Sequence, residues 1–283
     1  MSRLFVCLQH WLPARTLGRL VHRLSRARLR WWKNLLILGF CRLYGVDRAS
    51  AARPVPDGYA SFNAFFTREL KPGLRPIDPD PAALVAPADG RIAQFGEARA
   101  GRLLQAKGLD YSLADLCGSD RRAERYRDGA FLTIYLAPRD YHRVHAPAAG
   151  RLRWMHHIPG ERFAVNAATA ARLPGLFARN ERLVCHFEGD WGPFAVVLVG
   201  ALNVASIGTA WTGELPAPDR ARLWHYPPPS GPCLDRGQYL GQFNLGSTVI
   251  LLLPPGAARL DPGLTLDQRV FVGRRIGSLA GGT

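Results

Sequence analysis

The sequence is short of acidic residues, and its N-terminal region has no long hydrophobic run. Lysine and arginine number 37 against 22 aspartates and glutamates, so the formal net charge is +15. Such an excess favours a polyanionic partner, either nucleic acid or an anionic lipid surface. Uncharged stretches in this region, such as residues 34–41, are far shorter than the roughly 20 residues of a membrane-spanning helix. We therefore expect no transmembrane helix.

Cysteine is also scarce, with scattered residues at Cys7, Cys41, Cys117, Cys185 and Cys233. No two have the CxxC spacing of a zinc site, and no disulfide framework is indicated. We expect a reducing compartment and no metal site. Cys185 and His186 have the residue types of a nucleophile and its base. Neighbouring residues of a strand point to opposite faces, however, so Cys185 is better explained as a buried core residue.

Residues 1–50 form a basic block that differs from the remaining residues, 51–283. Basic side chains are spread among leucines and tryptophans, and Asp47 is the single acid of the block. This pattern predicts basic amphipathic helices, with Pro13 separating a short first helix from the next segment. No compact apolar region leads to a small-residue cleavage site, which argues against a secretory signal. We expect these helices to lie in a bilayer interface; the alternative is a helical hairpin packed on the main domain.

Beyond residue 50, short apolar runs alternate with glycine, proline and aspartate, a pattern typical of strands and turns. Strands are predicted over Phe131–Leu136, Phe194–Val199 and Val249–Leu253. Helices are predicted over Ser61–Leu70, Ser112–Leu116 and Ala167–Leu173, the first with Ser61 as its N-cap. The segment Tyr226–Pro232 is expected to be an extended surface loop. The predicted fold class is therefore α+β, with a mainly antiparallel β core and an N-terminal basic amphipathic helical region.

Three polar residues supply the acid, base and hydroxyl of a possible catalytic trio: Asp89, His145 and Ser247. A serine hydroxyl becomes a good nucleophile when a neighbouring base takes its proton and a carboxylate orients that base. Ser247 lies in the tetrapeptide Leu245–Thr248, just ahead of a predicted strand. By itself this tetrapeptide is typical of a turn, but a Gly–Ser bond in this position can also be a self-cleavage point.

Further segments accompany this tetrapeptide, namely Phe62–Arg68, Ala86–Gly90, Leu104–Gly108, Tyr135–His145, Ile158–Asn166 and Leu176–Arg182. In this order they resemble the phosphatidylserine decarboxylase family, whose pyruvoyl-dependent enzymes make phosphatidylethanolamine. The resemblance covers roughly residues 55–275. It implies a carboxy-lyase that is made as a proenzyme and acts on a lipid at a membrane surface.

The resemblance also implies how the prosthetic group arises. His145, oriented by Asp89, would activate Ser247, whose oxygen attacks the carbonyl carbon of Gly246. Elimination would then leave a pyruvoyl group at the new N-terminus. The products would be a β chain of residues 1–246 and an α chain of residues 247–283.

In the decarboxylation that the resemblance implies, the pyruvoyl carbonyl forms a Schiff base with the amine of phosphatidylserine and accepts the electron pair released with carbon dioxide. His142 is implied as the proton donor. On a strand, His142 and His145 would face opposite sides, whereas a turn brings both inward. Phe163 and Val165 are candidates for the lining of the substrate pocket, with core packing as the alternative. Tyr239 stands where relatives usually carry an acidic residue, which puts a carboxylate role there in doubt.

Two other functions use some of the same features. A serine hydrolase would use the trio for acyl transfer, although Ser247 lacks the G-x-S-x-G context. A nucleic-acid-binding module would use the basic block, although no helix-turn-helix, zinc-finger or RRM-like motif is present. The favoured interpretation is a peripheral enzyme on the cytoplasmic face of the cell membrane. Its expected partners are phosphatidylserine in an anionic membrane surface and its own two chains, with a homo-oligomer left open and no nucleic acid.

Overall fold

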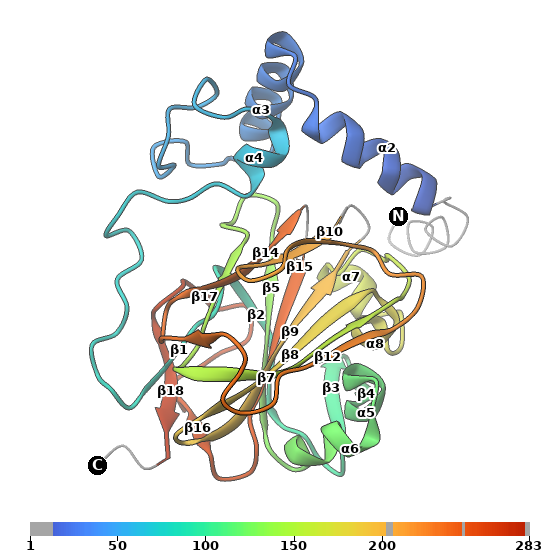
Figure 1. Cartoon of the computed structure of the whole chain (residues 1–283), viewed down its shortest axis with the longest axis vertical. Helices are drawn as coiled ribbons and strands as arrows, with labels where there is room; N and C mark the ends of the chain where they lie inside the picture. The colour runs from blue at the N-terminus through green and yellow to red at the C-terminus, as the bar shows by residue number, and fades with distance from the viewer. Residues whose placement is uncertain (1–13, 202–205, 245–246, 281–283) are drawn as a thin grey trace.

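Antiparallel strands make up most of the chain, and short helices flank them. The computed structural model describes residues 14–201, 206–244 and 247–280. Within these ranges, all pairs of named strands are antiparallel. The predicted α+β class with a mainly antiparallel core is confirmed. The sheets form the body of the molecule, and helices α2, α3 and α4 gather at one end of it (Figure 1).

The largest sheet has nine strands, in the order β12-β7-β8-β9-β15-β5-β2-β17, with β13 also paired to β7. Their bounds are β2 Gly90–Glu97, β5 Ala130–Leu136, β7 Gly150–Ile158, β8 Arg182–Gly189, β9 Gly192–Gly200, β12 Arg222–His225, β13 Cys233–Leu234, β15 Ser247–Leu252 and β17 Arg269–Val270. All six residues of β15 are buried. A strand buried on both faces is built from continuous apolar residues, which explains the valine, isoleucine and leucine run of β15.

The three predicted strands are confirmed as β5, β9 and β15, with ends displaced by one or two residues. The displacement matters in β15, which begins at Ser247 instead of Val249. The candidate nucleophile is therefore the first residue of a central strand, and not part of a turn before it.

Smaller sheets surround the large one, in the strand orders β11-β10-β14-β6, β1-β18-β16 and β3-β4. Their bounds are β1 Ala83–Val85, β3 Arg102–Ala106, β4 Leu109–Ser112, β6 Arg143–His145, β10 Ser206–Thr209, β11 Gly213–Pro216, β14 Tyr239–Asn244, β16 Ala258–Leu260 and β18 Arg275–Leu279. The short helices of the body are α5 Leu113–Cys117, α6 Asp120–Ala123, η1 Glu124–Tyr126, α7 Ala167–Ala170 and α8 Leu176–Arg179.

The first predicted helix is present as α4, Phe62–Phe66, and it is shorter than expected. Ser61 is its N-cap as predicted, since its Oγ accepts a hydrogen bond from the Ala64 amide at 3.2 Å. The helix ends at Phe66 with Thr67 as its C-cap, and Leu70 instead forms an isolated β-bridge with Ala51. Pairing with a distant segment thus replaces the last helical turn.

The other two predicted helices are confirmed in position. Helix α5 is capped by Ser112, whose Oγ accepts from the Asp115 amide at 3.2 Å. Helix α7 ends at Ala170, short of the predicted Leu173. The residue before a proline disfavours helical backbone angles, and Leu173 precedes Pro174.

The N-terminal region is helical, with α2 at Ala14–Arg26 and α3 at Arg30–Tyr44. Pro13 and the short first helix expected before it lie outside the described residues. Helix α3 buries Lys33, Ile37 and Cys41 on one face, at helical spacing. Together with α4, this face builds a second hydrophobic core, made of Ile37, Cys41, Val46, Ala51, Tyr59, Phe62, Phe65 and Phe66.

This region also exposes apolar side chains. The large hydrophobic side chains that remain accessible to solvent here are Leu20, Leu24, Leu29, Trp31, Leu35, Leu38, Leu43 and Tyr44. Trp31, Leu35 and Leu38 follow one another at helical spacing on α3, where they form a stripe. In the part of the chain that the structure describes, neither α2 nor α3 nor any later helix is long and apolar enough to cross a bilayer.

Two minor predictions are also confirmed. Cys185 lies in β8 and is fully buried, and burial raises the pKa of its thiol. Its neighbour His186 is hydrogen-bonded to the hydroxyl of Tyr126 at 3.0 Å. The loop 226–232 contains neither helix nor strand and lies at the surface.

Candidate active site

Ser247 sits where three strands of the large sheet end together. It pairs with Leu136 at the end of β5 and with Gly200 at the end of β9. Its side chain is fully buried. The other half of the expected cleavage site, Gly246, lies outside the described residues.

The nearest base to Ser247 is His142, which comes after the turn that ends β5. The turn is closed by Asp140, whose Oδ2 accepts from the Ala137 amide at 2.8 Å. His142 Nε2 lies 3.1 Å from the Ala137 carbonyl, and this contact requires the proton on Nε2. His142 Nδ1 is then an acceptor, and the Ser247 hydroxyl donates to it at 3.4 Å.

The surroundings of His142 keep it uncharged. The ring is fully buried and stacks on Phe66, with centroids 4.1 Å apart. Burial, followed by the positive charge of Arg68, lowers the pKa of His142 to about 3. At neutral pH the ring is therefore an unprotonated base beside a serine hydroxyl.

His145 is held in a separate set of contacts at the end of β6. Its Nδ1 donates to the Gly237 carbonyl at 2.8 Å, which leaves Nε2 to accept from the Tyr141 hydroxyl at 3.1 Å. Burial lowers the pKa of His145, against the opposing effects of the Gly237 hydrogen bond and the Asp89 charge. Gly237 has φ +78°, and a Cβ there would come within 2.5 Å of Ile77, so this carbonyl position depends on glycine.

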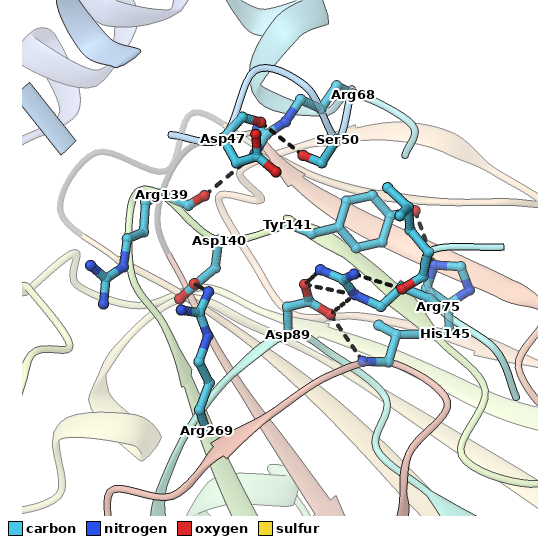
Figure 2. A network of polar contacts seen from close by, with 12 residues as sticks. Asp47, Ser50, Arg68, Arg75, Asp89, Arg139, Asp140, Tyr141, His145 and Arg269 are labelled. Carbon is cyan, nitrogen blue, oxygen red and sulfur yellow. Dashed lines mark hydrogen bonds and ion pairs between the residues drawn. The ribbon is translucent and has the colours of Figure 1, made fainter. Parts of the chain in front are cut away.

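Asp89 lies just before β2 and is almost fully buried. Its carboxylate accepts two hydrogen bonds from Arg75 Nε, at 2.8 and 3.0 Å, and a further one from Arg75 Nη2. The Val272 amide also donates to it, at 2.9 Å. Figure 2 shows Asp89 and Arg75 facing each other close to His145. Among the described residues, the hydrogen bonds of Asp89 go to Arg75 and Val272 and not to His145.

The structure thus gathers the predicted residues at one end of the sheet but joins them differently from the expected trio. Ser247 contacts His142, His145 contacts Tyr141, and Asp89 acts on His145 through its charge. The turn at residues 137–140 brings both histidines to the site, as the turn alternative required.

Tyr239 lies beside His145. The two residues are paired between β14 and β6, and their rings are 6.1 Å apart. The Tyr239 hydroxyl donates to Gln242 at 3.0 Å, and Arg143 lies over the Tyr239 ring. Tyr239 therefore supplies an aromatic wall, without a negative charge, next to His145.

Phe163 and Val165 are both buried and belong to the main hydrophobic core. Asn180 connects this segment to the site, since its Nδ2 donates to the carbonyls of Phe163 and Gly200, each at 2.8 Å. Gly200 is the sheet partner of Ser247. The segment is thus attached to the same strand end as the nucleophile.

Sequence reasoning missed Arg75, Tyr141 and Arg68 as parts of this region. All three lie in or near segments that resemble the family, but nothing in a linear sequence shows that Arg75 faces Asp89 or that Tyr141 holds His145.

Within the described residues, no group of three or more histidines, cysteines and carboxylates lies together as a metal site would require. A large open hollow, about 680 Å³, lies between the β3–β4 hairpin and helices α5 and α8, away from Ser247.

Comparison with known proteins identifies the family. A family model described as phosphatidylserine decarboxylase matches residues 62–278, and a second one, described as PSD, matches residues 4–45. The chain belongs to the phosphatidylserine decarboxylase family. This confirms the predicted family and its enzyme class, the carboxy-lyases. Members of the family depend in general on a pyruvoyl group.

Curated relatives extend the match over nearly the whole chain. The phosphatidylserine decarboxylase proenzyme of Methylococcus capsulatus is 49% identical over 98% of this chain and 96% of its own length. The proenzymes of Azotobacter vinelandii and Alkalilimnicola ehrlichii are each 48% identical over 98% of this chain, and over 98% and 96% of their own lengths. The basic N-terminal helices are thus part of the family's shared sequence.

Proposed function

We propose that the chain cleaves itself between Gly246 and Ser247 to form an N-terminal pyruvoyl group, and then decarboxylates phosphatidylserine to phosphatidylethanolamine. The observation that carries this proposal is the Ser247 hydroxyl, buried at the start of β15 and donating to an uncharged histidine at 3.4 Å. A hydrolytic serine would instead have to face an incoming substrate and water. Membership in the decarboxylase family supports the same assignment.

Self-cleavage needs a base for the serine proton and an electrophile next to it. Ser247 Oγ attacks the carbonyl carbon of Gly246, the peptide bond becomes an ester, and the amine of Ser247 takes up a proton. Removal of the Ser247 α-proton then expels the Gly246 carboxylate. The dehydroalanine that remains tautomerises to an imine. Water hydrolyses this imine to the pyruvoyl ketone and releases ammonia.

We assign self-cleavage to His145 and Asp89, and the proton transfer of decarboxylation to His142. In the uncleaved chain, Tyr141 occupies His145 Nε2 and Ser247 is bonded to His142. Activation of Ser247 by His145 therefore requires Tyr141 to release His145 and the serine side chain to turn. The competing assignment is that His142 itself takes the serine proton from the contact already present.

The residues around Ser247 fit a pyruvoyl group. The group is uncharged, and Ser247 is fully buried next to a histidine that burial keeps neutral. When present, the pyruvoyl group supplies an electron sink for the electron pair released with carbon dioxide. His142 Nδ1 would relay a proton there, and the Phe163–Val165 segment would exclude water from one side.

The N-terminal helices would hold the enzyme on the cytoplasmic face of an anionic membrane as a peripheral protein. The exposed apolar stripe on α3 and the many arginines of this region are the features that support this. The lipid substrate would then meet the enzyme at the end of the molecule that carries α2, α3 and α4.

Intact mass spectrometry under denaturing conditions tests the proposal. We expect two chains that part between residues 246 and 247, the smaller one lighter by one ammonia than a serine-terminated peptide. His145→Ala should remain uncleaved, while His142→Ala should be cleaved and inactive. The opposite pattern would assign the serine proton to His142. A stable single chain that reacts with a serine-directed phosphonate would support the hydrolase instead.

A further inference from the structure

Arg68 is a buried cation with unused hydrogen-bond donors. It comes directly after α4 and is only 3% exposed. Its Nη2 donates to the Arg139 carbonyl at 3.3 Å. Its Nε and Nη1 have no hydrogen-bond partner in the described part of the chain, where Arg68 also forms no ion pair.

The other arginine that is buried among the described residues, Arg182, is satisfied by the fold. Arg182, 5% exposed, donates from all three of its nitrogens to backbone carbonyls, those of Leu116, Asn180 and Asp115. Arg75 has the Asp89 carboxylate. Removing a charge from water without a partner is costly, and a buried guanidinium is normally paired or fully hydrogen-bonded. Arg68 is in neither state, which points to a partner that binds from outside the chain.

The location of Arg68 places these donors beside the reacting residues. Its guanidinium lies over the Phe65 ring, 5.0 Å from the centroid. The next residue, Phe66, stacks on His142, which in turn holds Ser247. The charge of Arg68 acts directly on His142. A ligand of Arg68 would therefore lie next to the atoms that react.

The chemistry of phosphatidylserine selects one anionic group for this position. Its ammonium would be repelled by a guanidinium. Its carboxylate must lose its charge as carbon dioxide departs, so pairing it with a buried cation would stabilise the ground state and slow the reaction. The phosphodiester keeps its charge throughout and matches the planar guanidinium donors. It is joined to the reacting carbon by one oxygen and one methylene group, so it stays close to that carbon.

We propose that the Arg68 guanidinium binds the phosphodiester of the phospholipid headgroup through its free Nε and Nη1 donors. This inference rests on the proposed decarboxylase function and adds to it the group by which the headgroup is recognised. Among the described residues, the hydrogen-bond and ring contacts of the Arg68 guanidinium are the Arg139 carbonyl and the Phe65 ring.

A comparison of two substrates on two enzymes tests the proposal. The substrates are short-chain phosphatidylserine and its methyl phosphotriester, in which the phosphate is uncharged. The wild-type enzyme should prefer the diester in kcat/KM by about 10- to 100-fold, the effect of a hydrogen bond to a charged group. Arg68→Gln should bring this ratio close to one. Arg143→Gln is the matched control, because Arg143 contacts Thr67 and Glu69 on either side of Arg68, and its ratio should stay that of the wild type.

A binding measurement separates recognition from turnover. Glycerophosphoglycerol carries the phosphodiester without amine or carboxylate, and calorimetry should show at least tenfold weaker binding to Arg68→Gln than to the wild type. Weaker binding of free L-serine with unchanged binding of glycerophosphoglycerol would show that Arg68 holds the carboxylate and would overturn the proposal. If Arg68→Gln fails to fold, the two substrates can still be compared on the wild-type enzyme. Equal kcat/KM values on the diester and the triester would refute recognition of the phosphate charge.

The two hypotheses fail in different ways. A wild-type chain that neither cleaves nor releases carbon dioxide contradicts the proposed function. A cleaved, active Arg68→Gln enzyme with the wild-type substrate ratio contradicts only the role of Arg68.

Discussion

At the scale of single residues, the site is built from neutral histidines in a dry environment. His142 and His145 each donate from one ring nitrogen to a backbone carbonyl, so the other nitrogen of each is fixed as an acceptor. One acceptor faces Ser247 and the other faces Tyr141. Two similar rings three residues apart thus present their acceptor nitrogens to two different hydroxyls.

Tyr141 is predicted to restrain His145. Tyr141→Phe removes the hydroxyl that occupies His145 Nε2, so self-cleavage should run as fast as in the wild type or up to about fivefold faster, the equivalent of one hydrogen bond. A time course of chain separation on denaturing gels measures it. Tyr239→Phe, which keeps a ring beside His145, is the control. An uncleaved Tyr141→Phe chain would show that Tyr141 takes part in the reaction.

His142 is predicted to make the fold sensitive to acid. Its pKa is about 3 in the folded chain, against 6.5 for an ordinary histidine, because burial disfavours the charged ring. Between pH 7 and pH 5 the unfolded chain therefore takes up a proton that the folded chain does not. The free energy of unfolding should fall by about 2 kcal/mol from this residue.

Denaturant unfolding of the uncleaved Ser247→Ala chain at the two pH values measures this loss. Adding His142→Gln should remove about 2 kcal/mol of the pH dependence. His186, whose pKa burial also lowers to about 3, should keep its own part of the acid sensitivity. An equal pH dependence with and without His142 would contradict this account.

Sequence reasoning named candidate site residues that the structure brings to one end of the sheet, but it did not give their hydrogen-bond partners. Asp89, His145 and Ser247 were found through the family's motifs, which are local in sequence. The contacts are not local: Ser247 and His142 are 105 positions apart, and Asp89 accepts from Val272, 183 positions away. Such contacts depend on the register of β15 between β5 and β9, which no local pattern reveals.

At the scale of elements, apolar periodicity was a good guide to strands and a poorer one to helix ends. The strands β5, β9 and β15 are dense in β-branched and aromatic residues, so the pattern was clear. Helix α4 stopped early because Leu70 pairs with Ala51, a contact made by a distant segment. The capping serines, Ser61 and Ser112, were predictable because a cap is a local hydrogen bond.

A carboxylate of the sheets, that of Glu214, is hydrogen-bonded to helix α2. Glu214 on β11 accepts from Arg26 at 2.5 Å and from His22 at 3.2 Å. It also accepts from Ser206, whose hydroxyl oxygen receives the Asn244 amide at 2.8 Å. A continuous chain of hydrogen bonds thus joins α2 to the end of β14, just ahead of the cleavage site.

Glu214→Gln is predicted to loosen α2 without unfolding the sheets. Because Glu214 is half exposed, the loss in unfolding free energy should be about 1 kcal/mol or less. Limited proteolysis should cut near residues 27–29 several-fold faster, with the β core intact. Glu161→Gln, which removes an exposed ion pair with Arg179, should leave this cleavage rate unchanged. Equal rates in the two variants would show that other contacts hold α2.

At the scale of the whole molecule, the described residues form two separate hydrophobic cores. The large core surrounds the sheets and the site, and the small one joins α3 to α4. The boundary predicted at residue 50 from the change in sequence pattern runs through the small core, which contains residues on both sides of it. Charge marks the surface that a region presents, whereas packing decides which segments fold together.

The exposed stripe of α3 is predicted to hold the enzyme on anionic vesicles. Replacing Trp31 and Leu35 by serine removes two of its most exposed apolar side chains, so binding should weaken by at least tenfold. Co-sedimentation with phosphatidylserine-containing vesicles measures it. Leu266→Ser, at an exposed apolar position outside the helices, is the control. Higher salt should weaken wild-type binding by screening the arginines. Unchanged binding of the double variant would exclude this stripe as the contact.

The central position of β15 affects how the cleaved enzyme can refold after denaturation. The segment that begins at Ser247 supplies β15 between β5 and β9, β17 beside β2, and β18 between β1 and β16. Once cut, it could leave only by the collapse of two sheets. Folding is unimolecular before the cut, whereas recovery after denaturation would be a second-order encounter of two fragments. Diluted, denatured enzyme should thus regain its structure more slowly and less completely than the intact precursor, and a cell would replace such an enzyme rather than refold it.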